Sequence, residues 1–157
     1  DDGVHGVAAA SDGTARLLAD TAEAITVSLH CEKNFPARKA ASDWDIPLPI
    51  GMGDTDYLRV VDDSLNYLLP LYQPDLVLYD AGVDVHQDDA LGYLNLTDAG
   101  LAARDTAVLQ HCLGRDIPVM GVIGGGYDRD RAALARRHGI LHHCAKQVWQ
   151  QRGLGPC

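Results

Sequence analysis

One apolar run of strand length constrains the fold of this chain more than any other feature. Leu76 to Tyr79 carries apolar residues on both faces, which is typical of a strand buried inside a parallel sheet. The loop that follows contains Asp84 and His86. Ligands of open α/β sheets gather beyond the carboxyl ends of such strands, so Asp84 falls where a functional group is expected. A carboxylate and an imidazole two residues apart form a candidate metal site, and a solvated acidic loop is the alternative.

Strands and helices alternate along the rest of the chain. Alternation and helical periodicity predict strands at residues 25–30, 76–79 and 117–123, and helices at 13–19, 55–72, 97–113 and from Asp128 or Asp130 to 149. Asp54 and Thr97 are expected to cap the second and third helices. Residues 31–53 lack periodicity and contain three prolines, so a long loop is predicted there. The order of elements predicts an α/β sandwich on a parallel sheet.

Size and charge narrow the class of protein. The 157 residues suffice for one domain, and the net charge of −9 argues against nucleic acid as the main partner. No window approaches the roughly 18 apolar residues that a membrane-spanning helix needs. The chain starts Asp-Asp-Gly-Val-His, with neither a start Met nor a signal peptide, so we interpret residues 1–157 as a single, partial domain. We expect a cytoplasmic protein with reduced thiols, and the nucleus is the alternative compartment.

A triple glycine follows the last predicted strand and leads directly into Tyr127. Glycines at 124–126 allow a sharp turn and the close approach of another group, and a Tyr hydroxyl can stabilise an oxyanion. The segment has no Lys and does not match Gly-x-Gly-x-x-Gly, so it fits a phosphate cradle poorly. Considered alone, the segment favours an ordinary tight turn with a packed Tyr over a functional site.

Together these segments resemble the zinc-dependent histone deacetylases and their acetoin-utilisation and acetylpolyamine relatives. Residues 80–92 (Asp-Ala-Gly-Val-Asp-Val-His-Gln-Asp-Asp-Ala-Leu-Gly) resemble that family's second metal-ligand loop, and residues 124–127 resemble its Gly-Gly-Gly-Tyr. Residues 28–39 resemble a segment that helps to hold a structural monovalent cation, and residues 12–15 resemble the sequence after its Asp-x-His ligand pair. The resemblance extends over about residues 12 to 147, and the segments occur in the same order as in the family.

The resemblance implies a three-layer α/β/α fold, arginase- and deacetylase-like, with a mainly parallel sheet and with the amino-terminal half missing from this chain. It also implies a Zn²⁺ ion held by two Asp and one His, which leaves a position open for water. Carried over by position, Asp84 is a zinc ligand, His5 is the candidate His ligand, and Tyr127 is the oxyanion donor. Gly3 stands where the family has its second ligand Asp.

Further roles carry over in the same way. Gly125 and Gly126 would border the acyl pocket, and Ser28 and Leu29 would contribute to the cation site, for which K⁺ is the candidate. The family's His-His pair, its general acid/base relay, lies upstream of the segment present here. The pair at 142–143 follows the Tyr motif in another helix, so we interpret it as structural or exposed.

The family implies an enzyme that hydrolyses the amide of an acetyl-lysine or a related acetylated amine. Its partners would then be an acetylated protein or a small acetylated amine, with no nucleic acid or membrane. The alternative is a catalytically inactive, truncated fragment that acts as a binding module. A partial domain would also expose one side of its sheet, which predicts either an apolar patch or a homo-oligomer that covers it.

Overall fold

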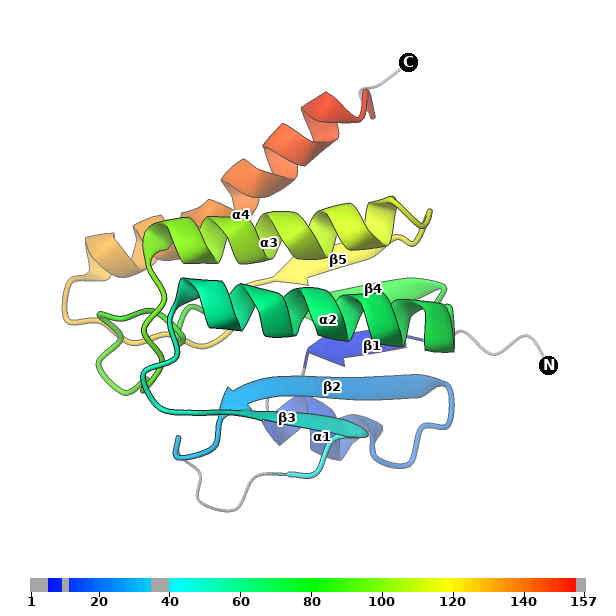
Figure 1. The fold of residues 1–157 in the computed structure, drawn as a ribbon, viewed down its shortest axis with the longest axis horizontal. Helices are drawn as coiled ribbons and strands as arrows, with labels where there is room; N and C mark the ends of the chain where they lie inside the picture. The colour runs from blue at the N-terminus through cyan, green and yellow to red at the C-terminus, as the bar shows by residue number, and fades with distance from the viewer. Residues whose placement is uncertain (1–5, 10–11, 35–39, 155–157) are drawn as a thin grey trace.

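The computed structural model describes residues 6–9, 12–34 and 40–154. The elements, in chain order, are β1 (Gly6–Ala9), α1 (Asp12–Leu18), β2 (Ala24–Cys31), β3 (Trp44–Leu48), α2 (Asp54–Tyr72), β4 (Leu76–Asp80), α3 (Asp98–Leu113), β5 (Val119–Val122) and α4 (Arg131–Gln151) (Figure 1).

All five described strands are parallel and form one sheet in the order β3-β2-β1-β4-β5. The register pairs Leu78 of β4 with Ala8 on one side and with Met120 on the other. Because the strands are parallel, the loops after β4 and β5 leave the sheet at the same edge. This confirms the α/β class with a parallel sheet that the sequence predicts.

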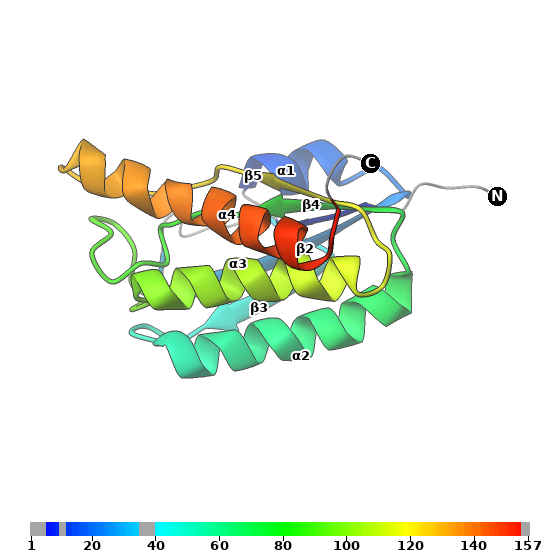
Figure 2. The same ribbon diagram turned by 90° about the horizontal axis from the view of Figure 1, so that it is seen from above.

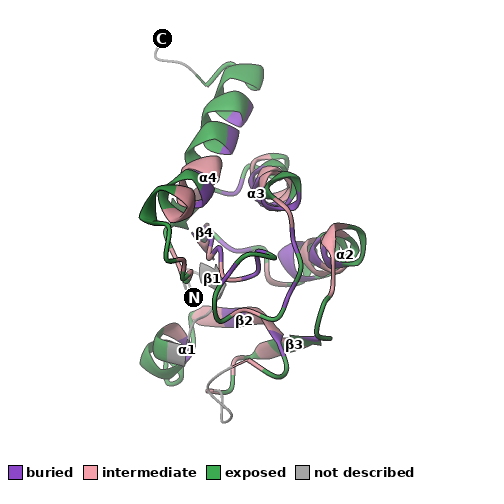
Figure 3. Cartoon of the chain, turned by 90° about the vertical axis from the view of Figure 1, so that its left-hand side faces the viewer, coloured by how far each residue is buried: buried purple, intermediate pink, exposed green. Residues whose placement is uncertain are grey.

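Helices α2 and α3 cover one face of the sheet, and α1 lies on the opposite face (Figures 2 and 3). α2 buries Tyr57, Val61, Leu68 and Leu69, which recur at helical spacing and pack on the sheet with Val77 and Tyr79 of β4. α4 packs against α3 through a smaller apolar cluster of Leu109, Cys144 and Val148. The main core therefore lies between the sheet and the α2–α3 layer.

One face of β4 and β5 is left open. Side chains alternate across a strand, so Val77 and Tyr79 point into the core while Leu78 points the other way. Leu78, Met120 and Val122 are 38%, 57% and 38% exposed, and we call these three residues the open face. Three exposed apolar side chains thus lie on the side of β4 and β5 that faces away from the core. Among the described residues, no helix is both long and apolar enough to cross a bilayer.

The long loop predicted over residues 31–53 is wrong in part. Trp44–Leu48 forms β3, which pairs with β2 at the edge of the sheet. Its start is tied down by Asp43, whose carboxylate accepts hydrogen bonds from the backbone N–H (2.7 Å) and the hydroxyl (2.7 Å) of Thr26. Pro47 is compatible with an edge strand, because one side of such a strand makes no ladder hydrogen bonds. Pairing with a neighbour, which periodicity does not reveal, makes this segment a strand.

Helix ends follow the predictions closely, with one exchange of roles. Thr97 caps α3 as predicted, and its Oγ1 accepts from the N–H of Gly100 at 3.1 Å. The N-cap of α2 is Gly53 instead of Asp54. Asp54 lies in the first turn and accepts from the N–H (2.9 Å) and the hydroxyl (2.7 Å) of Thr97, which joins the starts of α2 and α3. Gly139 does not interrupt α4.

Candidate functional site

The loops after β4 and β5 are hydrogen-bonded to each other at the carboxyl edge of the sheet. Strand pairing continues through Ala81, whose N–H donates to the carbonyl of Val122 at 3.0 Å, and Val83 donates to the carbonyl of Gly125 at 2.7 Å. A Cβ on Gly125 would lie 3.0 Å from Oδ2 of Asp84, so this glycine allows the carboxylate to approach the turn. The structure thus brings Asp84 together with the glycine turn.

Two carboxylates at this edge are destabilised in their charged form. Burial, followed by the negative charge of Asp89, raises the pKa of Asp84, while Arg104 and His138 act in the opposite direction. Burial and the charge of Asp84 raise the pKa of Asp80, whose Oδ1 is buried without a hydrogen-bond partner among the described residues. Half-buried carboxylates held close together attract a cation or a proton.

Arg104 of α3 binds the main chain of the Asp84 loop, a role that the sequence analysis did not predict. Its guanidinium is buried, donates to the carbonyl of Gly82 at 2.7 Å and pairs with Asp105 at 2.9 Å. Tyr79 also donates to Asp105, at 2.6 Å. The sequence contains one sign of this role, because Arg104 and Asp105 interrupt a mostly apolar stretch of the predicted helix. Charged side chains on the buried face of a helix need partners, so such a pair indicates a structural or functional contact.

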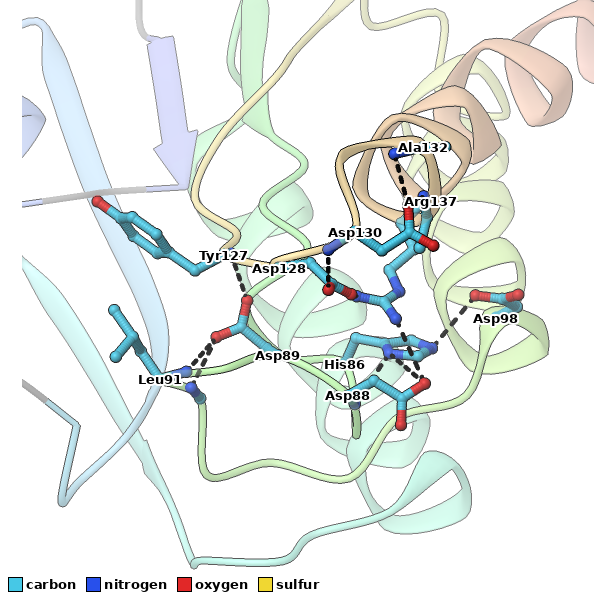
Figure 4. Close-up of polar contacts among 12 residues, drawn as sticks. His86, Asp88, Asp89, Leu91, Asp98, Tyr127, Asp128, Asp130, Ala132 and Arg137 are labelled. Carbon is cyan, nitrogen blue, oxygen red and sulfur yellow. Dashed lines mark hydrogen bonds and ion pairs between the residues drawn. The ribbon is translucent and has the colours of Figure 1, made fainter.

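His86 and Asp84 form a candidate metal site in the sequence, but the structure gives His86 other partners. The imidazole is buried, and its Nδ1 lies 3.1 Å from the N–H of Asp88, from which it accepts. Its Nε2 lies 3.2 Å from Oδ1 of Asp98 at the start of α3 (Figure 4). Because both ring nitrogens already have partners, the imidazole has no lone pair left for a metal.

Asp89 connects the two loops directly. Its side chain is buried, its Oδ1 accepts from the N–H groups of Leu91 (2.9 Å) and Gly92 (2.7 Å), and its Oδ2 accepts from the N–H of Tyr127 (2.6 Å) (Figure 4). In return, the N–H of Ala90 donates to the carbonyl of Tyr127 at 2.9 Å. Asp89 belongs to the segment that resembles the family's second metal-ligand loop, but only the fold shows that it connects this loop to the Tyr127 turn.

A second connection joins the same loop to α4. Arg137 is buried and pairs with Asp88 at 3.3 Å and with Asp128 at 2.8 Å (Figure 4). The guanidinium lowers the pKa of Asp128 after the larger effect of a hydrogen bond from the N–H of Asp130. The beginning of α4 is thereby fixed to the Asp84 loop.

Tyr127 lies at the same edge as Asp84, but its ring is mostly in solvent. The residue is 62% exposed, and its side chain points away from the group formed by His86, Asp88 and Arg137 (Figure 4). Asp84, Ser28, Leu29 and Gly125 line a cavity of about 280 Å³ between β2, β4 and α2, and Tyr127 is not among the described residues that line it.

Two further imidazoles, those of His30 and His138, lie near the residues described above. Ser28 Oγ lies 2.9 Å from Nδ1 of His30. His138 of α4 lies against the glycine turn, and its Nε2 is 3.4 Å from the position that a Cβ on Gly126 would take. Its Nδ1 is buried and has no hydrogen-bond partner within the described part of the chain. Burial lowers the pKa of His138, and the charge of Asp84 opposes that effect. His142 and His143 are exposed, as the sequence predicts.

The described residues do not make a complete zinc site by themselves. A catalytic zinc takes three protein ligands, and within residues 6–9, 12–34 and 40–154 no three His, Cys, Asp or Glu side chains come together for a metal. Asp84 is the one predicted ligand that is described. His5 lies outside the described residues, as does the segment 10–11 that follows the carboxyl end of β1.

Comparisons with known proteins agree with the fold and with the motifs. A family model for the histone deacetylase domain matches residues 8–146. The chain is 46% identical over 138 residues to an uncharacterised protein of Picosynechococcus sp., covering 88% of this chain and 46% of that protein. It is 28% identical over 144 residues to a probable deacetylase of Archaeoglobus fulgidus, covering 83% of this chain and 39% of the relative.

Solved structures show the same fold. A histone deacetylase homologue in complex with SAHA superimposes with a TM-score of 0.67 at 21% identity, over 92% of this chain and 42% of the other. The HD domain of HDA15 gives a TM-score of 0.69 at 19% identity, over 92% and 45%. The chain therefore has the α/β fold of these deacetylase domains, and it spans less than half the length of the relatives that it matches.

The match to the domain family decides the assignment. The chain belongs to the histone deacetylase family, which is a family of deacetylase hydrolases.

Proposed function

We propose that this chain carries the Asp84–Tyr127 part of a zinc-dependent deacetylase site, which hydrolyses the amide of an acetyl-lysine or a related acetylated amine. The observation that supports this most is the joining of the Asp84 loop to the glycine turn, through the 2.7 Å bond from Val83 to Gly125. It leaves the carboxylate and Tyr127 at one edge of the sheet. Membership of the family supplies the reaction class.

The described site residues each have a proposed task. Asp84 would hold the metal, which when bound lowers the pKa of water and polarises a carbonyl. Tyr127 would donate its hydroxyl proton in a hydrogen bond to the oxyanion that forms on the acyl group. Gly125 and Gly126, without side chains, would let the acyl group approach the main chain.

Further proposals concern ions and partners. Ser28 and Leu29 would hold a structural K⁺; both line the same cavity as Asp84. The net charge of −9 suits a cationic substrate such as an acetylated basic protein or polyamine, in the cytoplasm or the nucleus.

A catalytically inactive binding module is the second candidate. It is favoured by the incomplete ligand set among the described residues and by the exposed phenol of Tyr127. Such a module would retain the fold and the loop connections without turning over an amide.

Measuring zinc content and acetyl-lysine peptide hydrolysis in parallel separates the two candidates. We expect about one zinc per chain, with zinc lost in Asp84→Ala and retained in Tyr127→Phe. Turnover should fall by roughly 100- to 1,000-fold in Tyr127→Phe, as for the loss of an oxyanion donor elsewhere, and should be lost in Asp84→Ala. The exposed His143→Ala serves as the matched control and should change neither quantity. A chain with neither zinc nor turnover would be the binding module.

A further inference from the structure

Tyr127 lacks the packing that normally positions a functional side chain. The residue is 62% exposed, so contacts with neighbouring side chains do little to restrict its ring. The residues before it are three glycines, and Gly126 has a φ of 151°, a conformation that other residues rarely adopt. Glycines also lose the most conformational freedom when they become ordered, so the triple glycine does not by itself hold Tyr127 in one orientation. Something outside the turn must fix the direction in which Tyr127 leaves the main chain.

The hydrogen bonds of Asp89 supply that support. One carboxylate oxygen accepts from the N–H of Tyr127 at 2.6 Å, and the other accepts from the N–H groups of Leu91 and Gly92 at 2.9 and 2.7 Å. The carbonyl of Tyr127 accepts from Ala90 at 2.9 Å. Both main-chain polar groups of Tyr127 are therefore bound to the Asp84 loop.

The buried charge of Asp89 makes this connection stronger than a neutral turn bond. The residue is 9% exposed and forms no ion pair with any Lys, Arg or His of the described ranges, so the N–H groups carry its stabilisation. Hydrogen bonds to an ionised acceptor are shorter and roughly twice as strong as neutral ones. Asp89 lies five residues after Asp84 in the same loop, so its bond to the N–H of Tyr127 connects the Asp84 loop with the Tyr127 turn.

We infer that Asp89 is a positioning residue that ties the Tyr127 turn to the Asp84 loop and so sets where the phenol stands relative to the acyl group. The inference rests on the proposed function for the role of the phenol. The connection itself does not depend on catalysis and can be tested separately.

Amide hydrogen exchange followed by NMR on the whole chain tests the connection. Asp89→Asn keeps the shape but replaces one acceptor oxygen with an NH₂ group, so it can accept from one side only. We expect exchange to accelerate by about tenfold or more either at Tyr127 or at Leu91 and Gly92 together. Asp88→Asn is the same chemical change one residue earlier, where the carboxylate contacts Arg137, and it should leave these three amides unchanged. Unaltered exchange in Asp89→Asn would overturn the inference.

A double-mutant comparison tests the role in turnover. For an acetyl-lysine peptide, we expect Asp89→Asn to lower kcat by about tenfold with KM within about twofold, because an interaction that positions the phenol acts mainly in the transition state. If Asp89 acts through Tyr127, adding Asp89→Asn to Tyr127→Phe should cause little further loss, whereas an independent structural role gives multiplied losses.

The two measurements separate this inference from the proposed function. Multiplied losses, or an unchanged kcat, would contradict the positioning role. If the unchanged chain has no turnover, the proposed function fails, while the exchange experiment still decides whether Asp89 holds the Tyr127 turn.

Discussion

Gly92 shows how strongly single positions in the Asp84 loop are constrained. A Cβ at this position would overlap the backbone carbonyl oxygen of Asp84 and lie 3.3 Å from the Cβ of Asp89. Main-chain atoms cannot rotate away as the end of a flexible side chain can, so the loop itself would have to move. The constraint comes from close approach, because the backbone of Gly92 does not require a positive φ.

Replacing Gly92 with Ala should therefore destabilise the fold by roughly 2–3 kcal/mol, in the range of an overpacked interior position. Gly139→Ala in α4 is the matched control, because a Cβ there would have no described residue within 4 Å. This second change should stabilise the chain by about 0.5–1 kcal/mol through better helix propensity. Urea unfolding monitored by circular dichroism measures both. Equal effects of the two substitutions would show that the clash is relieved at little cost.

At the scale of elements, the starts of α2 and α3 are held by one shared polar contact. Thr97 accepts from Gly100 through Oγ1 and donates to Asp54, which also accepts from the N–H of Thr97. Because α3 carries Arg104, whose guanidinium binds the carbonyl of Gly82, the placement of α3 bears on the Asp84 loop.

Thr97→Ala should lower the free energy of unfolding by about 1–2 kcal/mol, the usual cost of losing a side-chain cap together with one more hydrogen bond. Thr55→Ala, at an exposed position in the first turn of α2, is the control and should change stability by less than about 0.5 kcal/mol. Chemical denaturation of both variants measures the difference. A loss in Thr97→Ala no larger than in the control would mean that Asp54 alone holds the two helix starts together.

At the scale of the whole molecule, the open face is the feature that most affects behaviour in solution. Leu78 and Met120 pair in register, and Val122 follows on the same face, so three exposed apolar side chains adjoin one another. Monomers rarely leave a contiguous apolar surface in water. We therefore expect this chain, purified alone, to associate with itself.

Sedimentation velocity over a range of concentrations should show self-association, and Met120→Lys should shift the population toward monomer. Met120 is 57% exposed, so the substitution should alter folding stability little. Leu71→Lys, at a 52% exposed position on α2 away from the open face, is the matched control and should leave the association unchanged. A monodisperse monomer at every concentration would contradict the expectation.

The sequence by itself determined those features that local physics sets. The apolar run at 76–79, the amphipathic pattern of 55–72 and the cap at Thr97 predicted β4, α2 and the start of α3. The resemblance of residues 80–92 and 124–127 to family motifs pointed to Asp84 and the glycine turn. Such features follow from side-chain spacing and from the conformational preferences of Gly, Pro and Thr, which act over a few residues.

Only the tertiary structure decided which of these groups meet. It made residues 44–48 a strand by pairing them with β2, turned His86 toward Asp88 and Asp98, and placed Arg104 under Gly82. It also gave Asp89 three N–H donors from two loops, one of them 38 residues away. Contacts between distant segments depend on how parallel strands and their crossovers pack in space. No local pattern in the chain encodes them.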